Sequence, residues 1–398
     1  MGTIKNGPQI AGFGSPTEGL GTETWDQLAG DNFYAASGWL DFCVHDPGGR
    51  TRTGNVHAGL SGGGTAAVPV TAVWEENNGF YQWNRLLDRV GLPSAATQGL
   101  LVGPHRGYQT NLLVSEGADR VEAAGALLGE LAELRRQAAA ERLFDDGRQD
   151  RIPCYGMFLN STDVRALRSA GVRAEPVLCA ADAWIRTEGN DWNSWMRTLP
   201  SKRRGELIRR DQRRFDAVGY SFIERPLSEC YEEAALMSQG TQERYGQPAD
   251  VGVLAESLRV QAEAMGDAAR VLMCARDGEP PVGFLLFYRW GDATFLKGAG
   301  FHYDRLVGVA EYFNLVYYEP IRDALRAGRR WLHAGIASTD TKAMRGAEVR
   351  PLWMMDVFGD DTGNDAIRAY NAAQLRELTE SSTAVSKAVV EDDWLEFC

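Results

Sequence analysis

The sequence contains no apolar run that approaches the roughly 18 residues needed to cross a membrane, so we expect no transmembrane helix. Its first residues, MGTIKNGP, lack the apolar segment of a secretory signal, and we therefore expect a cytoplasmic protein. Six widely separated cysteines form no C-x-x-C pair, which argues against a disulfide framework and against a zinc site. The five histidines show no H-E-x-x-H spacing, so we expect no metal.

Basic residues are fewer than acidic ones. The 398 residues include 54 acids and 42 bases, which leaves a net charge of −12 at pH 7. This balance argues against a protein that coats nucleic acid or anionic membrane with its whole surface, although it allows a local basic patch. The length suits two domains, and an apolar content of 44% is typical of globular chains with ordinary cores.

Helix and strand patterns alternate in both halves of the chain, which predicts an α/β (α+β) protein built from two modules of similar design. The first module is expected to open with a helix at 25–36. In the second, three strand patterns between 270 and 301 are separated by an Asp-Gly and a Gly-Asp turn, which predicts an antiparallel meander. The expected parts are a flexible N-terminal arm (1–22), an N-terminal module (23–190), a C-terminal module (191–360) and a helical polar tail (361–398).

The segment Arg305-Leu306-Val307-Gly308-Val309-Ala310 follows this meander and opens a helix that we expect over 308–327, bent or restarted at Pro320. A glycine turn at the start of a helix presents free backbone N–H groups and the positive end of the helix dipole to an anion. Arg305, Gly308 and Ala310 are therefore candidates for binding the phosphates of a donor. The alternative is an ordinary turn between a strand and a helix.

A second segment, Gly335-Ile336-Ala337-Ser338-Thr339-Asp340-Thr341-Lys342, leads from a strand pattern into a short helix. A lysine ammonium beside an acyl carbonyl stabilises the oxyanion that forms when an amine attacks, which makes Lys342 a candidate catalytic residue. The alternative is a surface lysine. The candidates near these motifs for proton transfer are Asp304, Glu311, Asp340, His302, Tyr303, Tyr312 and Tyr317, from which we select Asp340 and Tyr312.

The third segment is strongly basic. Eight bases and two acids lie between Arg197 and Arg214, a local charge of +6. On a helix, Lys202, Arg209 and Arg213 lie opposite an apolar inner face. Such a stripe suits the phosphates of a nucleic-acid backbone or of a nucleotide-bearing donor. The alternative is a solvated helix face paired with acids of the other module.

Together these segments resemble the GNAT acyltransferase superfamily and, within it, the Fem-type, peptidoglycan-biosynthesis-like tandem-GNAT aminoacyltransferases. Arg305-x-x-Gly308-x-Ala310 matches the motif that cradles pyrophosphate in that superfamily. Lys342 matches a Fem-type lysine that lies beside the acyl carbonyl of the aminoacyl-tRNA, although Thr341 replaces the aromatic residue that precedes it there. The resemblance implies two tandem GNAT-like modules with a groove between them. The second module is too short to hold the coiled-coil arm of the Fem ligases that extend cell-wall bridges.

The resemblance also implies a function. It suggests an N-acyltransferase that moves an aminoacyl group from aminoacyl-tRNA to an amine of a small-molecule or peptide acceptor, in specialised-metabolite or cell-wall-type biosynthesis. The tRNA would be a co-substrate, and no prosthetic group is expected. Two alternatives stay open: acyl-CoA as the donor, which the 305–310 motif supports, and a GNAT-like binding module without catalysis.

Overall fold

A computed structural model describes residues 13–93, 95–144, 152–189, 191–199, 201–247 and 249–398. The chain divides into two compact units. Unit 1 comprises Met1–Ala180, Pro351–Glu380 and Glu391–Cys398, and unit 2 comprises Ala181–Arg350 and Ser381–Val390. The chain leaves unit 1 inside strand β6 (Val177–Arg186) and returns inside strand β12 (Ala347–Asp356). The units are therefore not the contiguous segments suggested by the sequence, because two strands contribute to both.

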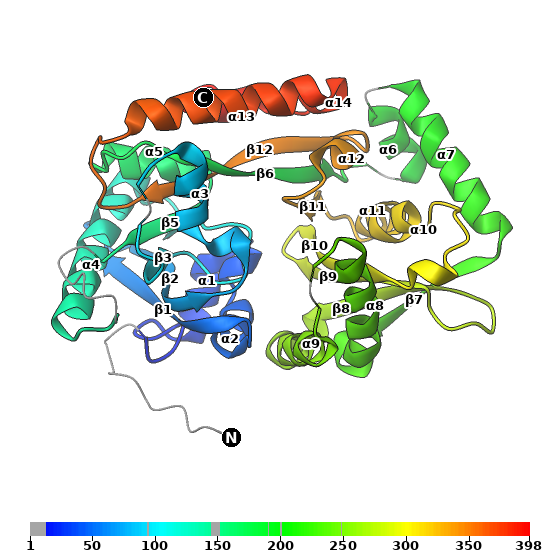
Figure 1. Cartoon of the computed structure of the whole chain (residues 1–398), viewed down its shortest axis with the longest axis horizontal. Coiled ribbons are helices and arrows are strands. Elements are labelled where there is room, and N and C mark those ends of the chain that lie inside the picture. Colours follow the sequence, from blue (N-terminus) through cyan, green and yellow to red (C-terminus); the bar gives the residue numbers. More distant parts are fainter. Residues whose placement is uncertain (1–12, 94, 145–151, 190, 200, 248) are drawn as a thin grey trace. The chain divides into compact units, whose positions relative to one another are not determined.

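Unit 1 is a sheet covered by helices (Figure 1). Its strand order is β1 (Gly49–Gly59), β2 (Thr65–Glu76), β3 (Gly99–Val102), β5 (Cys154–Leu159) and the end of β12, with β4 (Leu113–Val114) also paired to β2. The pair β3–β5 is parallel and the other pairs are antiparallel. The helices are α1 (Thr22–Ala29), α2 (Ser37–His45), α3 (Trp83–Val90), α4 (Arg120–Ala140), α5 (Ser161–Ser169), α13 (Asn364–Ser381) and α15 (Glu391–Trp394). Because Leu127, Leu131 and Leu134 recur at helical spacing, α4 buries one face against β1 and β2.

The start of unit 1 differs from the expectation. The helix expected at 25–36 ends at Ala29, because Gly30 adopts a φ of 50° that only glycine adopts readily, and the next α-helix begins at Ser37. Residues 1–12 of the expected arm lie outside the described residues. The remainder of that arm is held in place, since Phe13 is buried and Asn55 donates to two of its carbonyl groups.

Unit 2 has the strand order β6, β11 (Trp331–Gly335), β10 (Ala293–Phe301), β9 (Gly283–Trp290), β8 (Ala269–Arg276) and β7 (Tyr220–Pro226). Strands β8, β9 and β10 form the expected antiparallel meander, whereas β10 and β11 are parallel. The helices are α6 (Trp192–Thr198), α7 (Lys202–Ala217), α8 (Tyr231–Arg244), α9 (Val251–Met265), α10 (Glu311–Phe313), α11 (Glu319–Arg326), α12 (Thr339–Ala343) and α14 (Thr383–Ser386).

The helix expected over 308–327 starts later and contains an irregularity. It begins with α10, passes through a π-helical segment at Asn314–Tyr318, and ends with α11. Pro320 lies in the first turn of α11, where its missing N–H is tolerated. The π turn thus lies just before Pro320, and α11 begins beside this proline, where the sequence predicts a bend or a restart; π turns occur frequently at functional sites.

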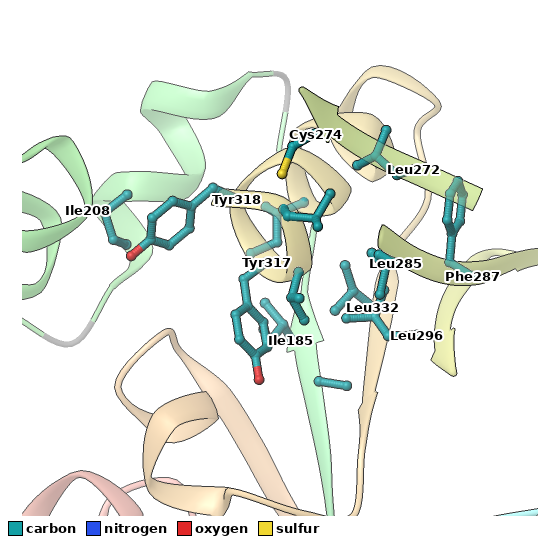
Figure 2. Packing of buried hydrophobic residues seen from close by; sticks show 14 of the residues in the cluster. Ile185, Ile208, Leu272, Cys274, Leu285, Phe287, Leu296, Tyr317, Tyr318 and Leu332 are labelled. Carbon is teal, nitrogen blue, oxygen red and sulfur yellow. The ribbon is translucent and has the colours of Figure 1, made fainter. Parts of the chain in front are cut away.

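The core of unit 2 lies between α7, the π segment and the sheet. Figure 2 shows Ile208 from α7 beside Tyr318 from the π segment, with Leu285 and Leu332 from the strands. Phe215 is buried on the same face of α7 as Ile208. Burial of each such side chain stabilises the fold by roughly 1.5–3 kcal/mol. The apolar face of α7 is therefore fixed on the core, and its basic face is left in solvent.

Candidate active site

The parallel strands β10 and β11 pair over only three residues of each strand. Beyond this register β10 continues to Phe301, while β11 ends at Gly335 and pairs with β6 along its other edge. The carboxyl ends of neighbouring parallel strands are a common place for ligand sites in α/β proteins. The segments that carry Gly308 and Lys342 both start at these ends.

Lys342 is buried, with 4% of its surface exposed, so the surface-lysine alternative is wrong. After β11 the chain turns back through Gly335 and Ser338, both at positive φ, and places Nζ of Lys342 2.8 Å from the carbonyl oxygen of Gly335. Burial lowers the pKa of Lys342 to about 8, and the charge of Asp182 opposes part of that shift. At neutral pH the side chain is therefore mainly an ammonium, with N–H groups beyond the one donated to Gly335.

Asp182 belongs to a buried polar cluster that sequence reasoning missed. One carboxylate oxygen of Asp182 lies 2.7 Å from Nε2 of His333, and the other accepts from the indole N–H of Trp184 at 2.7 Å. Asp182 and Trp184 come from β6 and His333 from β11, which pair with each other. The only signal in the sequence was an acid and a histidine inside two apolar strand patterns. The cluster places a fixed negative charge close enough to favour the ammonium form of Lys342.

Arg345 connects α12 to the helix that follows the Gly308 loop. Its guanidinium carbon lies 3.7 Å from the ring centre of Phe313. It donates from Nη1 to the carbonyl of Thr341 at 2.8 Å and from Nη2 to the hydroxyl of Tyr318 at 3.3 Å. The Tyr318 hydroxyl donates to Asp211 of α7 at 3.0 Å. A buried polar chain therefore runs from α7 through the π segment to the segment that carries Lys342.

Helix α7 contacts both of the other motifs. Near its start, Arg204 donates to the carbonyl of Ala343 in α12 at 3.1 Å. Near its end, Arg214 donates to the carbonyl of Gly308 at 2.9 Å. The two arginines are ten positions apart on the helix, which corresponds to a rise of about 15 Å. The structure thus brings the three sequence motifs together around one helix.

The basic face of α7 is open. Lys202, Arg209 and Arg213 are exposed, and none of them forms an ion pair with any side chain that the structure describes. The exposed Arg203 likewise forms none within the described part of the chain. Acids of unit 2 that are exposed elsewhere commonly pair with arginines, as Glu256 does with Arg259. Within unit 2, no described acid neutralises these four cations, and a pairing with acids of the other module stays an open alternative.

The loop at 305–310 has the left-handed geometry of an anion-binding turn, with Gly308 at φ 76° and Ala310 at φ 65°. However, an anion from the chain already fills it. The N–H groups of Val307, Gly308 and Val309 donate to the carboxylate of Glu311 at 2.8, 3.0 and 2.9 Å. Sequence reasoning placed Glu311 among the candidates for proton transfer and did not foresee this contact.

The other selected residues are on the surface. Asp340 is exposed on α12, two residues before Lys342. Tyr312 is 38% exposed, and its hydroxyl lies 3.4 Å from that of Tyr317. Arg305 is also exposed, at the start of the loop. These three side chains are therefore accessible to a ligand, whereas Lys342 is buried and its ammonium lies against the carbonyl of Gly335 at the end of β11.

No group of three or more His, Cys, Asp or Glu side chains among the described residues is arranged to hold a metal ion. None of the described helices combines the length and the apolar character that a membrane crossing requires.

Comparisons with known proteins give the fold. No protein-family model matches the sequence, and no curated protein matches it. The structure is similar to the crystal structure of FemX, with a TM-score of 0.58 and 11% identity over 91% of this chain and 98% of FemX. It is also similar to L-PGS from Bacillus licheniformis, with a TM-score of 0.52 and 11% identity over 90% of this chain and 97% of L-PGS. The chain therefore shares its fold with FemX and L-PGS, in line with the Fem-like fold that the sequence resemblance implied.

Proposed function

We propose that this protein is an acyltransferase that moves an aminoacyl group from aminoacyl-tRNA to an amine of a small-molecule or peptide acceptor, forming an amide or peptide bond. The observation that carries the proposal is the position of α7. The exposed cations Lys202, Arg209 and Arg213, which form no ion pair within the described residues, lie on the helix that holds the Lys342 segment through Arg204. A long polyanion bound along α7 would have its reactive end beside Lys342. The cytoplasm, where tRNA is charged, is the proposed location.

The chemistry needs no covalent enzyme intermediate. The neutral acceptor amine attacks the ester carbonyl of the donor, a C–N bond forms, and the carbonyl oxygen becomes an oxyanion. The ammonium of Lys342 stabilises this oxyanion. The C–O bond to the ribose then breaks, the amine loses a proton, and the ribose oxygen gains one. Asp340 and Tyr312 are the groups proposed to carry these protons. Asp340 is exposed two residues before Lys342, and Tyr312 is exposed in the segment that follows the Gly308 loop.

Acyl-CoA is the second candidate donor. The GNAT-like fold and the left-handed turn at Gly308 and Ala310 favour it, since such a turn suits a pyrophosphate. If acyl-CoA is the donor, Arg305, Gly308 and Ala310 bind it, and the cations of α7 do not take part in donor binding. A binding module without catalysis is the third candidate, and it predicts no transfer from either donor.

The test supplies both donors to the full chain. Total tRNA charged with radiolabelled amino acids, or radiolabelled acetyl-CoA, is incubated with the protein and an extract of small molecules and peptides. After mild alkali, label in an amide product survives, whereas the aminoacyl ester is hydrolysed. We expect alkali-stable product from the charged tRNA only, and we expect RNase treatment of the donor to abolish it. Product formed from acetyl-CoA and resistant to RNase would contradict the tRNA proposal.

A matched pair of variants separates the donors further. Replacing Lys202, Arg209 and Arg213 by Glu reverses the charge of the proposed tRNA-binding surface. Gly308→Val instead places a branched side chain at a φ of 76° in the loop. We expect the triple reversal to abolish most of the transfer and Gly308→Val to leave it within about threefold. The opposite result would support acyl-CoA as the donor.

A further inference from the structure

The loop at 305–310 presents an anion-binding geometry that the chain fills with its own carboxylate. Val307, Gly308 and Val309 are consecutive, and their three N–H groups converge on Glu311 at 2.8–3.0 Å. Successive N–H groups that point into one concavity form an anion site, and here both oxygens of one carboxylate occupy it. Glu311 is only 3% exposed, so solvent does not compete for these bonds.

The loop is also held from its opposite side. Arg214 of α7 donates to the carbonyl of Gly308 at 2.9 Å, while the N–H of Gly308 donates to Glu311. Ala310 keeps a positive φ of 65° in this arrangement, which is uncommon for a residue with a side chain. The loop is therefore fixed with its N–H groups turned inward onto Glu311.

The carboxylate acts on its surroundings as a negative charge. Burial raises the pKa of Tyr220 to about 12, and the charge of Glu311 adds to that shift. Burial likewise raises the pKa of Cys274 to about 12, again with a contribution from Glu311. A phosphate that approached the loop would meet this charge and find the three N–H groups already bonded.

We propose that Glu311 is a donor-specificity residue, whose carboxylate occupies the loop and excludes the diphosphate of a nucleotide-linked acyl donor such as CoA. This inference rests on the proposed aminoacyl transfer, in which the phosphates of the donor bind instead to the open face of α7. The turn then serves as a structural element of unit 2, with its N–H groups bonded to a side chain three residues after Gly308.

Direct binding measurements test the proposal with CoA and inorganic pyrophosphate as probes. Isothermal titration calorimetry is run on the full chain, on Glu311→Ala and on Glu311→Gln. Glu319→Gln is the matched control, because Glu319 lies on the same helical stretch and pairs with Arg326 away from the loop. We expect no saturable binding to the parent or to the control, and at least tenfold tighter binding of both probes to Glu311→Ala. Glu311→Gln keeps one acceptor oxygen without the charge, so its affinity for both probes should increase less than that of Glu311→Ala.

The outcomes distinguish this inference from the proposed function. If Glu311→Ala is folded and binds CoA and pyrophosphate no more tightly than the parent, Glu311 only stabilises the loop. That result overturns the inference, whichever donor the protein uses. Saturable binding of CoA to the parent that changes the hydrogen-exchange rates of the loop N–H groups relative to the CoA-free protein overturns it as well, and this result does not depend on any variant folding. If aminoacyl-tRNA proves inactive while Glu311→Ala gains affinity, the proposed donor fails and the role of Glu311 stands.

Discussion

Arg204 of α7 donates a hydrogen bond of 3.1 Å to the backbone carbonyl of Ala343, the residue after Lys342. Burial lowers the pKa of Arg204, while the charge of the nearby Asp340 opposes that shift. The contact ties the basic helix directly to the short helix of the candidate catalytic lysine. Since Arg214 ties the other end of α7 to Gly308, the relative positions of the three motifs depend on this one helix.

Lys342→Ala should lower the turnover of aminoacyl-tRNA by on the order of 10²–10³, because it removes the ammonium that stabilises the oxyanion. The rate is measured under single-turnover conditions with saturating donor. Lys387→Ala, which changes an exposed lysine of unit 2, is the control and should be neutral. If Lys342→Ala is folded and turns over within about threefold of the parent, the assignment is wrong.

Activity should fall as pH rises through about 8, because the buried Lys342 loses its proton near that pH and the neutral amine stabilises an oxyanion poorly. The pH profile is measured as initial rate, corrected for spontaneous hydrolysis of the donor ester. A rate that does not fall through this range would contradict the oxyanion role of Lys342.

The contribution of Lys342 to the free energy of unfolding should rise with pH, whereas the reaction rate should fall. The pKa of Lys342 is lower in the folded chain than the ordinary value of 10.5, so between about pH 8 and 10.5 the unfolded chain binds more protons. The free energy of unfolding should therefore rise with pH across this window through Lys342. Urea unfolding of the parent and of Lys342→Met at several pH values measures the effect. Equal slopes for both proteins would show that Lys342 does not titrate there.

Donor affinity should fall steeply with salt, because each phosphate contact releases counterions. Reversing Lys202, Arg209 and Arg213 to Glu should weaken tRNA binding and reduce the slope of log affinity against log salt by roughly two to three. The fold should survive, since all three side chains are exposed. Filter binding of charged tRNA over a range of salt gives both quantities.

The control for this experiment is a second triple reversal in unit 1, at the exposed Arg85, Arg136 and Arg376. It changes the net charge of the chain equally. Loss of binding in the control to the same extent would show that α7 has no special role and that only total charge matters.

Tyr318→Phe should destabilise the protein by about 1–3 kcal/mol, because it removes the donor of the buried Asp211 and an acceptor of Arg345. The free energy of unfolding is measured by urea denaturation. Tyr245→Phe, which changes a tyrosine that is 72% exposed, should stay within 0.5 kcal/mol. A neutral Tyr318→Phe would show that the polar chain between α7 and α12 contributes nothing to stability.

Local pattern was enough to predict much of unit 2. The meander follows from strands joined by Asp-Gly and Gly-Asp turns, and the orientation of α7 follows from helical spacing, which buries Ile208 and Phe215 and exposes Lys202. Strand β7 was not expected. It lies at the edge of the sheet with most of its side chains outside the core, so its hydrophobic signal is weak.

The chemistry at Lys342 and Glu311 was decided by tertiary structure. The sequence by itself determined which residues are present, that Lys342 follows a strand, and that a glycine turn opens a helix. Only the fold brought Asp182 to His333 across 151 residues and Arg204 to Ala343 across 139. The burial that lowers the pKa of Lys342 likewise comes from side chains distant in the sequence. Glu311 is near its partners in the sequence, but its carboxylate folds back onto the loop because the left-handed turn at Gly308 and Ala310 aims three N–H groups at one point. Such convergence depends on backbone dihedral angles, which residue patterns do not specify.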